Sequence, residues 1–109
     1  KENRKPVIKW ELKEEESRFN GEEIVKDVTL SAKSSYDIDG TIKNYRWDFG
    51  DGSRESGKII THPFKSAGEY EIKLTISDDK EETRSLSKTF TIKRKVFFIY
   101  FINHNLLIF

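Results

Sequence analysis

Four carboxylates in two short polar stretches are the residues of this chain best suited to chemistry. Asp37 and Asp39 stand in one stretch, and Asp78 and Asp79 open the other. If the fold brings both stretches to one end, their oxygens form a ligand set for a hard cation such as Ca²⁺. The same residues are also typical of Asx-turns, in which an Asp side chain bonds to backbone two residues on. A calcium site on Asp37, Asp39 and Asp78 is therefore one of two interpretations.

The spacing of Asp37 and Asp39 also occurs at the start of an EF-hand loop, but that pattern fails here. Ile42 occupies the position at which the loop requires glycine, and the segment beyond it is predicted to be a strand. A cation site would therefore not be an EF-hand.

A second pair of carboxylates, Asp48 and Asp51, flanks a turn, but nothing near it in the sequence completes a catalytic site. The chain has no Gly-x-Ser-x-Gly elbow, no His-Glu-x-x-His motif and no glycine loop for phosphate. Asp48 is expected to point outward and Asp51 to bond to amides of the turn. His62, which precedes a proline, is expected to be a structural hydrogen-bonding residue. We therefore predict that the chain is not an enzyme.

Exposed aromatic rings are candidates for surface contacts, because a flat ring can stack on the apolar face of a sugar or on a collagen ridge. Trp10 alternates with Ile8 and Leu12, which favours burial. Tyr36 lies in a polar loop and is expected to be exposed. Tyr36 is the candidate surface contact, although one tyrosine does not establish carbohydrate binding.

Composition narrows the class of protein. The 109 residues are enough for one domain, and 20 Lys and Arg against 19 Asp and Glu leave a net charge of +1. No overall field attracts nucleic acid, so no nucleic-acid partner is predicted. The chain has no cysteine, which excludes disulfides and thiolate metal sites. It begins at Lys1 without methionine or an apolar leader, so we expect a piece of a longer protein.

Alternation of apolar and polar residues predicts the strands that position these loops. A charge run over 13–18 has no apolar stripe and is interpreted as a solvated connection, and Asn20-Gly21 predicts a turn. Short strands separated by turn residues, with almost no helical periodicity, predict an all-β, two-sheet antiparallel sandwich. The predicted strands cover 8–12, 27–33, 42–49, 58–61, 70–77 and 86–92.

One predicted strand contains the aromatic anchors of the core. Tyr45, Trp47 and Phe49 are spaced two apart, which places them on one face, and a tight turn, Gly50-Asp51-Gly52-Ser53, follows. The strand 58–61 must end near His62-Pro63 because proline cannot donate to a ladder, and such a strand suits a sheet edge. Tyr70 has the position of a tyrosine corner, whose hydroxyl bonds to backbone upstream.

Several stretches together resemble the polycystic kidney disease (PKD) domain family. The resemblance covers Pro6 to about Ile92, and the family's tyrosine is replaced by Phe64, which loses a hydroxyl and keeps the ring. The matching stretches are Val28-Thr29-Leu30-Ser31-Ala32, Ser35-Tyr36-Asp37-Ile38-Asp39-Gly40-Thr41-Ile42, Trp47-Asp48-Phe49-Gly50-Asp51-Gly52, Thr61-His62-Pro63-Phe64, Ala67-Gly68-Glu69-Tyr70 and Ile72-Lys73-Leu74-Thr75-Ile76-Ser77-Asp78.

The resemblance implies an immunoglobulin-like, extracellular or cell-surface module without catalytic activity. Some members of the family bind calcium in the region of the acidic loops. The implied function is binding or spacing in a surface or secreted multidomain protein, through contacts with protein or polysaccharide and with neighbouring domains. The alternative is a module that targets a secreted protease, such as a collagenase, or a glycan hydrolase to its substrate.

The predicted domain covers 6–92, with a linker over 1–5 and a basic, then apolar, tail over 93–109. Residues 96–109 are fewer than the roughly 20 that a membrane span requires, and a polar triplet interrupts them, so a complete span is excluded. A fragment of a membrane anchor, additional strands and a non-native extension remain as alternatives for the tail.

Overall fold

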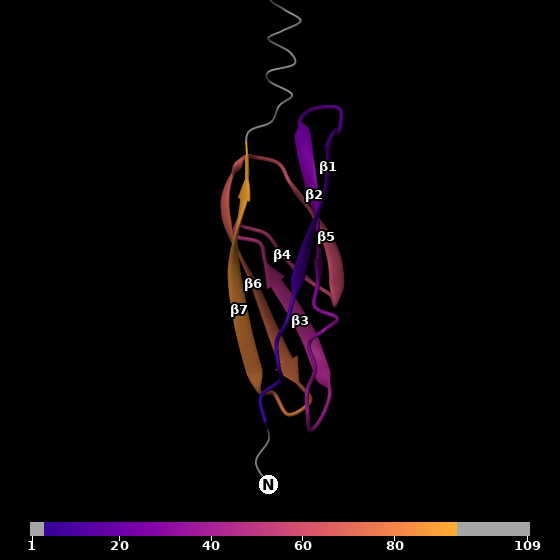
Figure 1. Ribbon diagram of the computed structural model, residues 1–109, viewed down its shortest axis with the longest axis vertical. Helices are drawn as coiled ribbons and strands as arrows, with labels where there is room; N and C mark the ends of the chain where they lie inside the picture. Colours follow the sequence, from indigo (N-terminus) through magenta and orange to yellow (C-terminus); the bar gives the residue numbers. More distant parts are fainter. Residues whose placement is uncertain (1–3, 94–109) are drawn as a thin grey trace, which may run out of the picture.

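The computed structural model describes residues 4–93, which form two antiparallel β-sheets facing one another (Figure 1). This confirms the predicted all-β sandwich. One sheet has the order β1-β2-β5 and the other the order β4-β3-β6-β7. Nothing helical in these residues has the length and apolar character of a membrane span. The strands are β1 (Glu11–Phe19), β2 (Ile24–Ser31), β3 (Ile42–Asp48), β4 (Arg54–Ser56), β5 (Ile59–Phe64), β6 (Gly68–Asp78) and β7 (Thr83–Ile92).

The core lies between the sheets and is built by alternation along the strands. On β6, Ile72, Leu74 and Ile76 are fully buried, while the residues between them lie on the other face. Burying one such side chain contributes about 1.5–3 kcal/mol. Across the sandwich, β2 contributes Val28 and Leu30, which are also fully buried. The alternation that is visible in the sequence therefore fixes which face of each sheet points inward.

Aromatic rings fill the space between the sheets. Trp10 and Trp47 meet edge to face, with ring centroids 5.4 Å apart. Phe64, which replaces the tyrosine of the family pattern, is buried and makes an edge-to-face contact with Phe49. The core therefore retains the ring at position 64 without a hydroxyl.

The interpretation of 13–18 as a solvated connection is wrong, because these residues belong to β1. Its side chains are mostly exposed on both faces, and the strand is held by its backbone pairing with β2. Two ion pairs across the strands add to this, Arg18 with Asp27 at 2.6 Å and Lys26 with Glu14 at 3.3 Å. The outer part of the β1–β2 hairpin extends past the neighbouring strands in Figure 1. A strand in that position does not need an apolar face.

The first strand also begins later than the predicted range 8–12. It starts at Glu11, and ahead of it Val7 forms a single antiparallel bridge with Tyr36. Trp10 is buried, as predicted, and its indole Nε1 donates to the carbonyl of Leu86 at 3.1 Å. Its burial therefore comes from the packing of an irregular segment and does not require a regular strand.

Two further boundaries differ from the prediction. The strand β5 continues past Pro63 to Phe64, and it is an outer strand, as predicted. An outer strand leaves every second N–H unpaired, which is why proline is compatible with it. The three-residue β4 was not predicted, because it is fully exposed and has no alternation of burial.

The turns follow the local chemistry of the sequence. Between β1 and β2, Asn20 Oδ1 accepts hydrogen bonds from the amides of Glu22 and Glu23, both at 2.9 Å, and Gly21 has φ +103°. This confirms a turn at Asn20-Gly21. The predicted tail lies outside the described residues apart from Lys93.

Candidate functional site

The stretch 47–53 forms a structural turn at the end of β3. Trp47 is buried, and its Nε1 donates to the carbonyl of Gly57 at 2.8 Å. Gly50 has φ +78°, and a Cβ there would lie 2.7 Å from the carbonyl oxygen of Glu71. Only glycine fits this backbone conformation so close to β6. At the far end of the turn, Gly52 has φ +93°.

The two carboxylates of the turn, those of Asp48 and Asp51, have different partners. Asp48 Oδ1 accepts the amide of Gly50 at 3.0 Å, and its Oδ2 lies 3.4 Å from Arg54 Nε on the outer face of the sheet. Asp51 Oδ1 accepts the amide and the hydroxyl of Ser53, the amide at 3.0 Å. Both side chains therefore close the turn in the manner of Asx-turns.

His62 of β5 connects this turn to the opposite sheet. Its Nε2 lies 2.7 Å from Asp51 Oδ2, and its ring stacks on Phe49 with the centroids 3.8 Å apart. Burial of Asp51 disfavours its charge, but the hydrogen bonds from Ser53 and His62 outweigh burial and lower the pKa of Asp51. The pair acts as a clasp between the two sheets, and we call it the His62–Asp51 clasp.

The proximity of Ser53, His62 and Asp51 does not make a nucleophilic relay. Ser53 Oγ lies 3.3 Å from Nε2 of His62, and Asp51 contacts the same ring nitrogen. A relay needs the nucleophile and the carboxylate on opposite nitrogens of the imidazole. The arrangement can hold the fold together, but it cannot activate the serine hydroxyl.

The acidic loops do meet at one end of the sandwich. Carboxylate oxygens of Asp37, Asp78 and Asp79 lie within 4.8 Å of one another. Asp78 is buried, and its Oδ1 accepts the amides of Lys80 and Glu82 at 2.9 and 2.8 Å. The structure thus contains both the Asx-type turn and the gathering of oxygens that the sequence indicated.

Asp39, which was predicted as a ligand, is not one of the three carboxylates within 4.8 Å of one another, but its Oδ1 is buried without a hydrogen-bond partner, so its part in a cation site stays a prediction. Its Oδ2 accepts the amide of Arg4 at 2.9 Å, and this bond is the main cause that lowers the pKa of Asp39. Asp79 completes the three-carboxylate group instead, and its Oδ1 also accepts the amide of Thr41 at 3.3 Å. The sequence signal for Asp79 was its place beside Asp78 in the same turn.

The surroundings of Asp37 disfavour its charge. Both of its carboxylate oxygens are buried without a hydrogen-bond donor. Desolvation, followed by the neighbouring Asp39, raises the pKa of Asp37. A cation would relieve this arrangement, because it would supply the positive charge that the carboxylates lack. Gly40 borders this group, and a Cβ there would collide with the Asp79 carboxylate.

Tyr36, the candidate surface contact, is 47% exposed. Lys9 Nζ lies 5.9 Å from its ring centroid. The next residue with the same orientation in the loop, Ile38, is 58% exposed. The two side chains flank Asp37, so this loop turns its carboxylate inward and its apolar groups outward.

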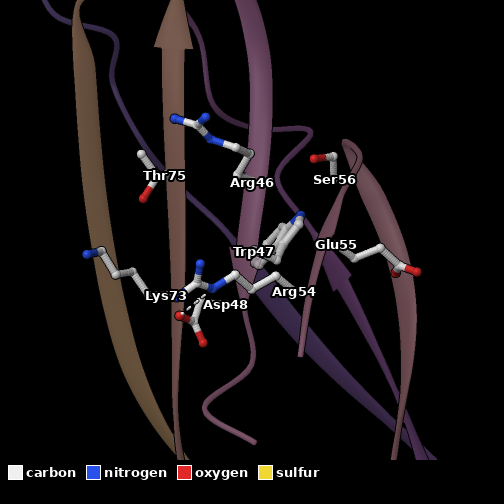
Figure 2. Close-up of a pocket in the computed structure, with 8 residues that line it drawn as sticks. All are labelled: Arg46, Trp47, Asp48, Arg54, Glu55, Ser56, Lys73 and Thr75. Carbon is white, nitrogen blue, oxygen red and sulfur yellow. Dashed lines mark ion pairs between the residues drawn. The ribbon is translucent and has the colours of Figure 1, made fainter. Parts of the chain in front are cut away.

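A further site, which sequence analysis did not identify, is a surface hollow of about 420 Å³ over β3, β4 and β6 (Figure 2). The sequence contains one sign of this hollow, because polar residues alternate with the buried Trp47 and with the buried Leu74 and therefore point outward. The sequence does not show that β3 and β6 are neighbours, which is what brings these polar residues together. The hollow is lined by Arg46, Trp47, Asp48, Arg54, Glu55, Ser56, Lys73 and Thr75.

Comparison with known families matches residues 3–94 of this chain to the model described as "PKD domain". Among curated relatives, collagenase ColA of Clostridium perfringens is 38% identical over 65 residues, which cover 60% of this chain and 6% of ColA. The pre-pro-metalloprotease PrtV of Vibrio cholerae is 34% identical over 91 residues, which cover 84% of this chain and 9% of PrtV. The chain thus spans less than a tenth of either relative.

Solved structures show the same similarity. The PKD1 domain of Vibrio anguillarum Epp aligns with a TM-score of 0.67 and 30% identity, over 86% of this chain and 100% of that one. A chain from a study of promiscuous specificity in carbohydrate-binding modules of the β-sandwich superfamily aligns with a TM-score of 0.72 and 30% identity. That alignment covers 85% of this chain and 36% of the other.

Proposed function

Because this chain belongs to the PKD domain family, we propose that it is a non-catalytic binding and spacer module of a secreted or cell-surface multidomain protein. Its partners would be protein or polysaccharide at the cell surface or matrix, together with neighbouring domains. The observation that supports the proposal is the share of each relative that the chain matches. The chain aligns with a whole PKD1 domain but with only 6% and 9% of two proteases. Most of each protease therefore lies outside the similarity.

The site geometry supports the absence of catalysis. Within residues 4–93, the Ser, His and Asp side chains that lie together share one ring nitrogen and cannot form a relay. The test is to incubate the full chain with collagen, casein and a soluble polysaccharide and to search for products by mass spectrometry. We expect no products, and a product series that depends on Asp51 or His62 would contradict the proposal.

A second candidate function is targeting of a protease to its substrate, and the names of the curated relatives favour it. Three of them are named collagenases, from Clostridium perfringens, Vibrio alginolyticus and Bacillus cereus, at 38%, 36% and 34% identity. A module that binds the substrate raises the local concentration of a catalytic domain tethered to it. This mechanism requires an attached enzyme, whereas spacing does not.

Targeting is tested by fusing this chain to a collagen-hydrolysing catalytic domain that has no binding module. Targeting predicts faster hydrolysis of insoluble collagen and an unchanged rate on a short soluble peptide. Equal rates with and without the module on the insoluble substrate would refute targeting and would leave the spacer role intact.

The acidic loops favour a structural cation, and Ca²⁺ fits the oxygen donors of Asp37, Asp78 and Asp79. The specific support is the pair of Asp37 oxygens that are buried without a hydrogen-bond donor. Bound Ca²⁺ would join the loop before β3 to the β6–β7 turn. A ligand that binds only the native state raises the melting temperature.

The calcium proposal predicts a higher melting temperature in millimolar Ca²⁺ than in EDTA, with Mg²⁺ as the comparison ion. In Asp37→Asn the Ca²⁺-dependent rise should disappear. Glu22→Gln, which removes an exposed carboxylate from the β1–β2 turn, is the matched control and should retain it. Equal melting temperatures of the wild-type chain in Ca²⁺ and EDTA would rule out the site.

A further inference from the structure

The outer face of the four-stranded sheet presents three cationic side chains around the hollow of Figure 2. Register places Arg46 opposite Thr75, and Asp48 opposite both Lys73 and Arg54, so their side chains share one face. Figure 2 shows these side chains over β3 and β6. The hollow has a volume of about 420 Å³ and opens to solvent.

The positive charge of the hollow is only partly neutralised. Arg54 is paired with Asp48, whose other oxygen is held by the turn. Among the described residues, neither Arg46 nor Lys73 has an ion-pair partner within 4.0 Å. The remaining carboxylate of the lining, that of Glu55, points away from both in Figure 2.

Hydroxyl groups border this charge on the side of β7. Thr75 Oγ1 and Ser85 Oγ lie 2.9 Å apart, and Ser87 pairs with Lys73 across the strands. The same face of β7 continues with Thr89 and Thr91, which are both exposed. Of these hydroxyls, those of Thr75 and Ser87 lie opposite Arg46 and Lys73, whereas Thr89 and Thr91 lie opposite Glu71 and Glu69. Hydroxyls beside the two unpaired cations can donate to and accept from the hydroxyls of a sugar.

Three classes of ligand can be compared for this face: neutral sugars, proteins and polysaccharides with anionic groups. Neutral sugars are usually held by stacking on an exposed ring, and the exposed large apolar residues, Phe19, Tyr36, Ile38 and Ile59, all lie away from it. A protein partner usually finds an exposed apolar or aromatic anchor, and the one ring in the lining, that of Trp47, is only 1% exposed. Carboxylate or sulfate groups on a hydroxyl-rich polymer match both the cations and the hydroxyls.

We propose that this outer face is a binding site for a polysaccharide that carries carboxylate or sulfate groups. Arg46 and Lys73 contact the anionic groups, the hydroxyls of Thr75, Ser85 and Ser87 contact the sugar hydroxyls, and Asp48 holds Arg54 in position beside them. The inference rests on the proposed role as a binding module and names its ligand class. Glu71, two residues before Lys73 on the same face, lies outside the hollow lining and limits the site at that end.

The test is titration calorimetry of the full chain with four soluble probes at low and physiological salt. The probes are a heparin oligosaccharide for sulfate, oligogalacturonate for carboxylate, dextran as the neutral polymer and polyglutamate as the anionic peptide. We expect binding to one or both anionic oligosaccharides that weakens with salt. Dextran should not bind at this face, and polyglutamate should bind more weakly than the better oligosaccharide.

Two double variants distinguish a specific binding site from a general electrostatic attraction to the chain. Arg46→Gln/Lys73→Gln should weaken binding about tenfold, because two exposed charge contacts are lost. Lys13→Gln/Lys33→Gln, in β1 and in the turn after β2, makes the same change in net charge and should bind as wild type. Equal melting temperatures would show that both variants fold.

Three results would overturn the inference. These are no binding of either anionic oligosaccharide, equal losses in the two double variants, and polyglutamate binding as tight as that of the better oligosaccharide. If the chain fails these tests but is retained on collagen or on a neutral polysaccharide, the proposed binding function survives and only the ligand class is wrong.

Discussion

Removing the His62–Asp51 clasp should destabilise the fold, and the structure shows which contacts would be lost. In His62→Ala, the imidazole is lost from its stack on Phe49, at 3.8 Å, and from its hydrogen bond with Asp51, at 2.7 Å. The stacked contact is worth about 0.5–1.5 kcal/mol. A hydrogen bond to an ionised group is worth about 1.5–3 kcal/mol.

These contributions sum to about 2–4.5 kcal/mol, and water reduces the result. The Asp51 side chain is 24% exposed, against 12% for His62, so solvent can replace part of the lost hydrogen bond. We therefore expect His62→Ala to lower the free energy of unfolding by about 2 kcal/mol at pH 7. Urea unfolding followed by the fluorescence of the buried Trp10 and Trp47 measures it.

The clasp also predicts a dependence on pH. The folded pKa of Asp51 is lowered, so its contribution is fully present above the unfolded value of about 3.9 and is lost as pH falls through the folded value. The stability difference between wild type and His62→Ala should therefore narrow only below about pH 3.9, as the pH falls through the folded pKa of Asp51. It should approach the contribution of the stacked ring alone.

Two controls make the clasp prediction refutable. Asp51→Asn removes the charge and should remove most of the pH dependence, and its effect should not add to that of His62→Ala. Ser87→Ala, on an exposed position of β7, should change stability by less than about 0.5 kcal/mol. A loss below about 0.5 kcal/mol in His62→Ala, or a stability gap that does not narrow at any pH below about 3.9, would contradict this prediction.

Two further stability predictions concern single contacts. Tyr70→Phe removes the hydroxyl that donates to the Ser66 carbonyl at 2.6 Å, and should cost about 1 kcal/mol in urea unfolding while circular dichroism stays unchanged. Gly50→Ala adds a Cβ at φ +78° only 2.7 Å from the Glu71 carbonyl oxygen, and should lower the free energy of unfolding by about 2 kcal/mol or more. Ala at Gly21, where φ is +103° and no atom lies within 4 Å of the added Cβ, should cost less than at Gly50.

Much of the fold could be predicted from the sequence because burial alternates along its central strands. The alternation of Ile72, Leu74 and Ile76 with polar residues is what a half-buried strand requires, and the structure contains that strand as β6. The β1 strand could not be predicted in the same way. It is stabilised by backbone pairing and ion pairs with β2, and neither leaves an apolar pattern in the sequence.

The candidate sites could be predicted only as far as local chemistry allowed. Loop composition placed Asp37 and Asp78 together, but the choice between Asp39 and Asp79 depends on contacts across more than 30 residues, such as Arg4 with Asp39. The outer hollow likewise depends on the pairing of β3 with β6, which brings Arg46 next to Thr75. Pairing between distant strands cannot be read from either strand alone.

The most direct test of the account is co-sedimentation of the full chain with insoluble matrices. The panel is fibrillar collagen, chitin, cellulose and an insoluble pectate, with the fraction of chain in each pellet measured against bovine serum albumin as the control. The account predicts saturable retention on at least one matrix and no release of hydrolysis products from any of them. A chain that remains in the supernatant with all four, or that releases products, would contradict its role as a non-catalytic binding module.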